Sequence, residues 1–136
     1  MKEECFELEQ GSIRYVIKQQ EIMITSYHGN GVEVSIPSAI TKGIETLPVT
    51  TIGKKAFLGK RKLKKIVLPD SIKEIQDYAF ANCKKLESIV MSKECETFGQ
   101  GILQGCKSLK YIYDNQKEDE KETAALLAAT IEKLSA

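Results

Sequence analysis

The segment Ile52-Gly53-Lys54-Lys55-Ala56-Phe57 recurs at a spacing of 23 residues. Its counterparts are Ile75-Gln76-Asp77-Tyr78-Ala79-Phe80 and, with the Ala-Phe pair replaced, Phe98-Gly99-Gln100-Gly101-Ile102-Leu103. Further apolar positions keep the same register: Leu63, Leu86 and Leu109; Ile66, Ile89 and Ile112; Val49, Ile72 and Cys95. A fixed period of this length is the signature of a stacked repeat array, in which each unit buries its apolar side against its neighbours. The sequence therefore predicts a solenoid.

Each repeat contains two extended pieces and a turn. The segment Leu63–Leu68 ends with apolar residues at alternate positions, which is typical of a short strand. Pro69 ends this strand because proline has no amide hydrogen to donate to a neighbouring strand. A second extended piece, residues 71–75, follows. We expect Asp77–Ala81 to form a single helical turn that directs its Ala-Phe pair into the core.

The repeat also resembles a known family. Its pattern, Ile-Gly-x-x-Ala-Phe followed by Leu-x-x-Ile-x-Leu-Pro-x-Ser-Ile-x-x-Ile, is similar to the BspA-like leucine-rich repeats of bacterial cell-surface proteins, and residues 49–113 carry it. The resemblance implies a leucine-rich-repeat fold and a generic binding surface, without naming a ligand. The third repeat departs from the pattern at Met91-Ser92 and Ile102-Leu103, as expected of a degenerate repeat at the end of an array.

The two ends of the chain differ from the repeats. In residues 1–37 apolar and polar residues alternate, so we expect a β-hairpin cap and a first, incomplete repeat that protect the open sheet edge. Residues 38–48 are interpreted as a connecting loop. Residues 114–136 have an apolar stripe at helical spacing, which predicts a C-terminal helix that either covers the last repeat or pairs with another chain. The predicted fold is a single-domain α/β leucine-rich-repeat solenoid, predominantly β with short helical turns.

The composition is that of an ordinary globular chain. Its 136 residues suffice for one domain, and 20 Lys and Arg against 19 Asp and Glu give a net charge of +1. This balance argues against a dedicated nucleic-acid or membrane-surface protein, and no apolar stretch is long enough to span a membrane. The acidic, polar start does not resemble a signal peptide. We therefore expect a cytoplasmic protein, with the cell surface or secretion as the alternative if a leader has been removed.

No pattern in the sequence marks an active site or a metal site. The four cysteines form no CxxC pair, and the repeat register places Cys83, Cys95 and Cys106 at core positions, which leaves Cys5 as the most reactive thiol. Cys83 and Cys106 could instead form a thiol pair or a disulfide, but stacked equivalents seldom have the required geometry. His28 lies in a glycine-rich turn with no evident nucleophile beside it. We expect no enzyme, no cofactor and no metal.

A basic run without acids lies in the first full repeat. It comprises Lys54, Lys55 and Lys65, together with a possible basic patch of Lys60, Arg61, Lys62 and Lys64. The run could bind nucleic acid, an anionic glycan or an acidic protein. It could equally be the solvated surface between core positions. The lack of interleaved aromatic residues that would stack on bases favours the solvated surface.

The exposed strand face carries the strongest functional hypothesis. Because side chains alternate along a strand, the residues that flank the inward-pointing Ile66, Ile89 and Ile112 face outward. The outward positions are Glu33 and Ser35, Lys65 and Val67, Ser88 and Val90, and Tyr111 and Tyr113. Stacked, they would form a ladder that runs from polar to apolar and aromatic, and tyrosine is favoured at protein interfaces. The two tyrosines could instead pack under the C-terminal helix.

These features predict a non-enzymatic module that recognises another protein, or another macromolecule, through this face. The alternative is a structural adaptor that self-associates through its C-terminal helix. We expect a monomer or a weak homodimer, no specific nucleic-acid partner and no membrane insertion.

Overall fold

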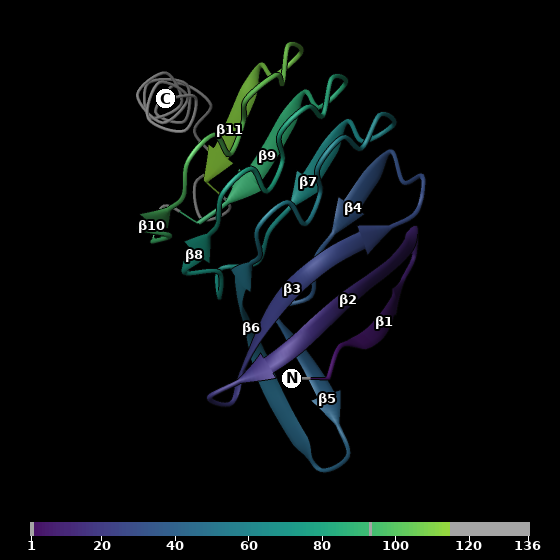
Figure 1. The fold of residues 1–136 in the computed structure, drawn as a ribbon, viewed down its shortest axis with the longest axis vertical. Coiled ribbons are helices and arrows are strands. Elements are labelled where there is room, and N and C mark those ends of the chain that lie inside the picture. The colour runs from purple at the N-terminus through teal and green to yellow at the C-terminus, as the bar shows by residue number, and fades with distance from the viewer. Residues whose placement is uncertain (1, 93, 115–136) are drawn as a thin grey trace.

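The computed structural model describes residues 2–92 and 94–114. This part of the chain folds into strands and turns, without a helix (Figure 1). A seven-stranded sheet contains β1 (Glu4–Leu8), β2 (Gly11–Lys18), β3 (Glu21–His28), β6 (Glu45–Ile52), β8 (Glu74–Ile75) and β10 (Thr97–Phe98), with β5 (Ala39–Lys42) paired to β6. A four-stranded sheet contains β4 (Glu33–Ser35), β7 (Lys65–Val67), β9 (Ser88–Met91) and β11 (Tyr111–Asp114). The leucine-rich-repeat prediction of a mainly β fold is confirmed.

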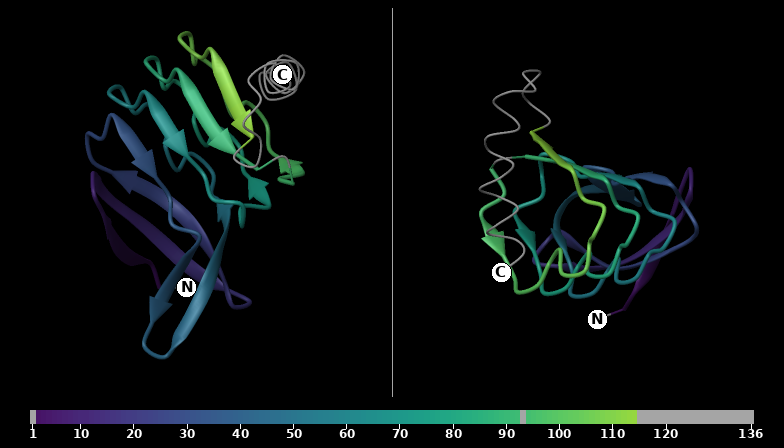
Figure 2. Two further views of the ribbon diagram at one scale, coloured as in Figure 1. Left: turned by 180° about the vertical axis from the view of Figure 1, so that it is seen from behind. Right: turned by 90° about the horizontal axis from the view of Figure 1, so that it is seen from above.

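The repeats wind between the two sheets, as the view along the stack shows (Figure 2). All pairs within the four-stranded sheet are parallel, and their register aligns Val34, Ile66, Ile89 and Ile112. All four of these side chains are buried. The 23-residue period therefore predicts the register of β7, β9 and β11 correctly, because each repeat contributes one inward-pointing isoleucine, whereas Val34 on β4 lies outside that period.

The N-terminal cap is an antiparallel meander of β1, β2 and β3. Gln19 and Gln20 link β2 to β3 with φ values of 53° and 63°, which is the left-handed geometry that a tight hairpin turn requires. β3 then pairs in parallel with β6. The meander thus extends the seven-stranded sheet beyond the repeats and covers the edge that the first repeat would otherwise expose.

A column of aromatic rings joins the cap to the repeats. The ring centroids of Tyr27 and Phe57 lie 5.3 Å apart with planes 14° apart, and those of Phe57 and Phe80 lie 5.2 Å apart at 26°. The hydroxyl of Tyr27 donates to the backbone oxygen of Gln10 and accepts from the Gly31 amide at 3.0 Å. The cap therefore shares one apolar core with the array, and its only polar tip in this column is satisfied.

The expected helical turn at Asp77–Ala81 is wrong. Tyr78 has φ 56° and Asn82 has φ 59°, and these left-handed residues interrupt a right-handed helix. The backbone instead makes short turns, and its amides bond to the next repeat, as from Tyr78 to the oxygen of Gln100 at 2.9 Å. Stacking between repeats takes the hydrogen bonds that a helix would have used. The Ala79-Phe80 pair is buried as predicted.

The expected loop at residues 38–48 is also wrong. Residues Ala39–Lys42 and Glu45–Ile52 form the antiparallel β5–β6 hairpin, which projects from the body of the molecule (Figure 1). Gly43 occupies the turn with φ 65°, a conformation that costs glycine little. Because Ile40 and Leu47 are buried while Thr41, Thr46 and Pro48 are exposed and Ala39 is half-buried, the segment has the alternation of a half-buried hairpin.

The predicted C-terminal helix, residues 114–136, lies outside the described residues apart from Asp114, which belongs to β11. Its two expected roles stay predictions. Within the described part of the chain, no helix has the length and apolar character needed to cross a membrane.

Candidate binding surface

The strand register aligns two rows of positions on the outer face of the four-stranded sheet. The first row is Glu33, Lys65, Ser88 and Tyr111, and the second is Ser35, Val67, Val90 and Tyr113, as the strand register shows. Glu33, Ser35 and Tyr111 are exposed, whereas the members on β7 and β9 are half-buried. We call these eight positions the ladder face. The structure brings the predicted residues together in this order, and their role in binding stays a prediction.

The chemistry of the ladder face changes from one end to the other. At β4, the Glu33 carboxylate lies 3.6 Å from the Lys65 ammonium, and the two side chains are 57% and 41% exposed. Val67 and Val90 form an apolar centre. At β11, Tyr111 is 49% exposed. Such a gradient offers a partner charge contacts at one end and aromatic area at the other.

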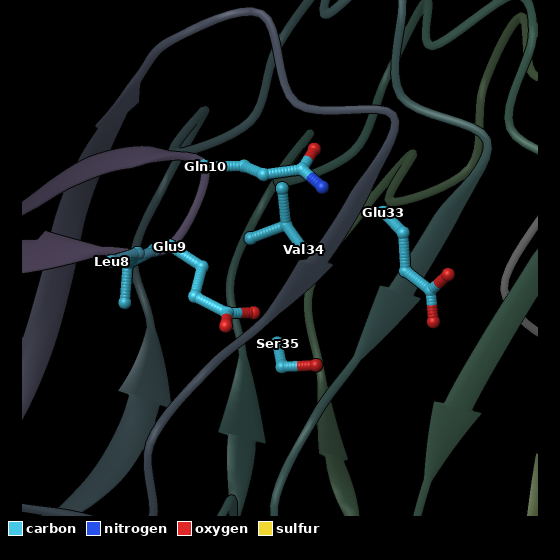
Figure 3. Close-up of a pocket in the computed structure, with 6 residues that line it drawn as sticks. All are labelled: Leu8, Glu9, Gln10, Glu33, Val34 and Ser35. Carbon is cyan, nitrogen blue, oxygen red and sulfur yellow. The ribbon is translucent and has the colours of Figure 1, made fainter.

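A hollow of about 430 Å³ adjoins the β4 end of the ladder face (Figure 3). Its lining residues are Leu8, Glu9 and Gln10 from the β1–β2 turn and Glu33, Val34 and Ser35 from β4. The side-chain oxygen of Gln10 accepts from the Val32 amide at 3.0 Å and holds the turn beside β4. The Glu9 side chain extends from the turn toward β4. With two carboxylates, the hollow suits a cationic side chain of a partner.

Sequence analysis missed Glu9 and Gln10 as members of this surface. They belong to the cap, and no repeat position corresponds to them. Only the folding of the meander against β4 brings them to the ladder face.

The cysteines serve packing rather than chemistry. All four are free, with Cys83 and Cys95 buried and Cys5 exposed, as predicted. Cys106, which was also predicted to be a core residue, is only half-buried. The Cys83 thiol donates to the Phe57 oxygen at 3.1 Å, and the Cys106 thiol makes the equivalent bond to Phe80 at 3.0 Å.

Burial suppresses ionisation of these thiols. It raises the pKa of Cys83 to about 12 and that of Cys95 to about 11, and it also raises the pKa of Cys106. A thiol that stays protonated at neutral pH is a poor nucleophile. The buried thiols are therefore poor candidates for a nucleophile.

His28 has a neighbour that sequence analysis missed. The Ser26 hydroxyl lies 2.9 Å from Nε2 of His28, because residues two apart on β3 share one face of the strand. The alternation rule could have found this pair. His28 is exposed, and no carboxylate among the described residues hydrogen-bonds its ring. The same part of the chain holds no cluster of three or more His, Cys, Asp or Glu residues that could bind a metal ion.

The predicted basic patch lies in the turn before β7. Arg61, Lys62 and Lys64 are exposed, and the Lys60 ammonium lies 5.8 Å from the centroid of the Tyr27 ring. The first three of the patch residues, Lys60–Lys62, line a hollow of about 270 Å³ opposite the turn Gly29–Gly31. The structure thus places the patch at one edge of the four-stranded sheet, beside the ladder face and not on it.

Residues 32–135 match the model of the BspA type leucine rich repeat region, in six copies. The chain belongs to this family. Proteins built from such repeats are generally binding modules without enzymatic activity. No curated protein matches this BspA type chain.

Solved structures of bacterial repeat proteins resemble this BspA type chain. A leucine rich cell surface protein of Faecalibacterium prausnitzii is 25% identical with a TM-score of 0.68 over 79% of this chain and 29% of its own. A leucine-rich repeat protein of Bacteroides capillosus is 20% identical with a TM-score of 0.58, and the match covers 82% of this chain and 98% of that protein. The Treponema pallidum leucine rich repeat protein is 20% identical with a TM-score of 0.51, and the match covers 91% of this chain and 94% of that protein. The latter two show the fold alone.

Proposed function

We propose that this chain is a non-enzymatic recognition module that binds another protein through the ladder face. The observation that supports the proposal is the strand register, which aligns chemically different residue types in two rows along the four-stranded sheet. Interfaces are enriched in tyrosine because its ring offers contact area at a low cost in side-chain entropy. The apolar centre at Val67 and Val90 adds area that a partner can desolvate.

The acidic hollow extends this surface. A partner chain that crosses the rungs would place apolar groups over Val67 and Val90 and a Lys or Arg between Glu9 and Glu33. The charged end would favour the correct orientation of the partner more than it adds affinity.

Substitution of the two tyrosines tests this proposal. The variant Tyr111→Ala/Tyr113→Ala should bind a partner captured by the wild-type chain about tenfold more weakly, because truncating an interface anchor costs on the order of 1–2 kcal/mol. The matched control is Ile44→Ala/Leu58→Ala, which removes two exposed apolar side chains away from the ladder face. Isothermal titration with the captured partner measures both.

Two outcomes would count against the ladder face. Equal losses in the two variants would show that exposed apolar area in general, and not this face, holds the partner. A drop of several kcal/mol in the unfolding free energy of the tyrosine variant would show that the tyrosines are structural.

For cellular location, we propose the cytoplasm. The alternative is the bacterial surface, which is where the Faecalibacterium relative is described to act. Protease treatment of intact cells distinguishes them, since only a surface protein is digested without lysis.

A further inference from the structure

The near-neutral net charge conceals a segregation of charge along the chain. Residues 49–113 contain 13 Lys and Arg against 6 Asp and Glu, whereas residues 1–48 contain 4 against 7. Residues 114–136 contain 3 against 6. The repeats are therefore strongly basic while both flanking regions are acidic, so the total of +1 does not exclude an anionic ligand for the repeats.

The cations of the repeats concentrate in the turns that precede β7, β9 and β11, which project in a row on one side of the four-stranded sheet (Figures 1 and 2). We call the following eight residues the basic ridge: Lys60, Arg61, Lys62, Lys64, Lys84, Lys85, Lys107 and Lys110. In the 23-residue register, Arg61, Lys84 and Lys107 are equivalent.

Backbone contacts hold these turns directly on one another. The Glu87 amide donates to the Lys64 oxygen at 2.8 Å, and the Lys110 amide donates to the Glu87 oxygen at 2.8 Å. The Ser108 hydroxyl donates to the Lys84 oxygen at 2.7 Å. Neighbouring rungs of a sheet lie roughly 4.8 Å apart, so equivalent cations are close enough to repel one another.

The cations of the basic ridge form no ion pair within the described part of the chain, although Glu87 shares the repeat position of Lys64 and Lys110. Seven of the eight members of the ridge are exposed. Glu87 is the one acid within the three turns, 59–64, 82–87 and 105–110. The cap differs, since Arg14 pairs with Glu3 and Lys42 with Glu4.

We propose that the basic ridge binds a linear anionic glycan. The repeat places cations at regular intervals along a line, which complements a polymer that carries sulfate or carboxylate groups at regular intervals. The lysine ammonium groups supply point charges, and the Arg61 guanidinium can bind an anionic group in bidentate fashion. The hollow of about 270 Å³ between Lys60–Lys62 and Gly29–Gly31 provides room for one such group at the cap end.

Other anionic partners fit less well. The three stacked turns contain no aromatic side chain, so nucleic acid would find nothing on which to stack its bases. The cap of a second copy is acidic, but its Glu3, Glu4 and Glu21 are already paired within the chain. The proposal does not depend on protein binding by the ladder face, because the ridge lies at the N-terminal ends of β7, β9 and β11, beside that face. It requires the cell-surface location, given above as the alternative to the cytoplasm, because sulfated and carboxylated glycans lie outside the cell.

Heparin, a sulfated glycan, is the probe for this proposal. The ridge variant is Lys84→Gln/Lys107→Gln, and the matched control is Lys2→Gln/Lys18→Gln, which removes two exposed cations from the cap and changes the net charge equally. The wild-type chain should be retained on heparin at 50 mM NaCl and eluted by salt. The ridge variant should bind about tenfold more weakly or worse, with the slope of log K against log salt reduced by roughly one per cation removed. The control should match the wild type.

Three results would overturn the proposal. One is failure of the wild-type chain to bind heparin at 50 mM NaCl. Another is an equal loss of heparin affinity in the ridge and control variants, which would show that heparin binds through the net charge of the chain and not through the ridge. The third is tighter binding to a single-stranded oligonucleotide of equal charge than to heparin, which would identify nucleic acid as the ligand. Thermal melts of both variants establish that each is folded.

Discussion

The cap and the repeats both form β-sheet, but their strands differ in length and direction. The cap uses long antiparallel strands of 5 to 8 residues, whereas the repeats use parallel strands of 2 to 4 residues in β7 to β10. Short strands make few hydrogen bonds each, so the repeats depend on side chains stacked in one core column. The two regions also treat charge differently. The cap pairs Glu3, Glu4 and Glu21 within the chain, and the basic ridge of the repeats does not pair its cations with another described residue.

This difference separates structural roles from binding roles. Surface ion pairs that are satisfied internally have little left to offer a ligand, whereas aligned unpaired cations attract anions. We infer that the array presents the basic ridge and most of the ladder face, and that the cap stabilises the array and contributes only Glu9 and Gln10, in the hollow beside β4, to binding. The following predictions test the two halves of this contrast.

The largest expected effect is at the junction of the two regions. Phe57 is fully buried between the rings of Tyr27 and Phe80, so Phe57→Ala leaves a cavity in the shared column. We expect a loss of about 3–5 kcal/mol in unfolding free energy. Urea denaturation measures it, with the exposed Leu58→Ala as the control. A loss below about 1 kcal/mol would mean that cap and repeats fold independently.

A second prediction concerns the turn that supports Tyr27. Gly11 has φ 101°, and a Cβ there would lie 2.6 Å from the His28 oxygen and 2.7 Å from the Tyr27 hydroxyl. Gly11→Ala should therefore cost about 2–3 kcal/mol. Gly43→Ala is the matched control, since Gly43 also has positive φ but its Cβ would meet nothing within 4 Å. It should cost about 1 kcal/mol. Equal costs in denaturation would show that the crowding around Tyr27 does not matter.

Alkaline pH should destabilise the repeats through their buried thiols. The pKa of Cys83 is raised to about 12 in the folded chain, against roughly 8.5 when unfolded. Above pH 8.5 the unfolded state loses this proton and the folded state keeps it, so stability is lost as pH rises from about 8.5 toward 12. By pH 10 the contribution of this group is about 1–2 kcal/mol. Cys83→Ala should lower the slope of unfolding free energy against pH between 9 and 10, and an unchanged slope would contradict the assignment.

The smallest effect is expected from the ion pair on the ladder face. The charged groups of Glu33 and Lys65 lie 3.6 Å apart, and both side chains are partly exposed to solvent. A double-mutant cycle with Glu33→Ala and Lys65→Ala should give a coupling below about 1 kcal/mol that disappears in 1 M salt. A larger, salt-insensitive coupling would mean that the array also uses its surface charges for stability.

Periodicity explains what could be read from the sequence. The 23-residue register and strand alternation sufficed to predict the isoleucine rungs and the six ladder-face positions on β7, β9 and β11. Glu33 and Ser35 were predicted instead from the likeness of the segment ending in Ile36-Pro37 to the one ending in Leu68-Pro69. The family was recognisable from the repeat pattern.

Features that depend on tertiary context could not be read in this way. Tyr78 adopts positive φ only because its amide bonds to the next repeat, so a helical turn was the wrong expectation. The acidic hollow needs Glu9 beside β4, and the β5–β6 hairpin contains Pro48, which obscured its strand pattern. The basic ridge was visible only in part, because the total charge hid the contribution of Lys84, Lys85, Lys107 and Lys110.

Site-specific photo-crosslinking tests most directly whether the protein partner binds to the ladder face of the array and not to the far end of the cap. A benzophenone amino acid would replace Ser88, at the centre of the ladder face, or Gln19, in the exposed β2–β3 turn of the cap. After irradiation with the captured protein partner, we expect a covalent adduct from position 88 and none from position 19. An adduct from position 19 with none from position 88 would contradict the assignment of binding to the array.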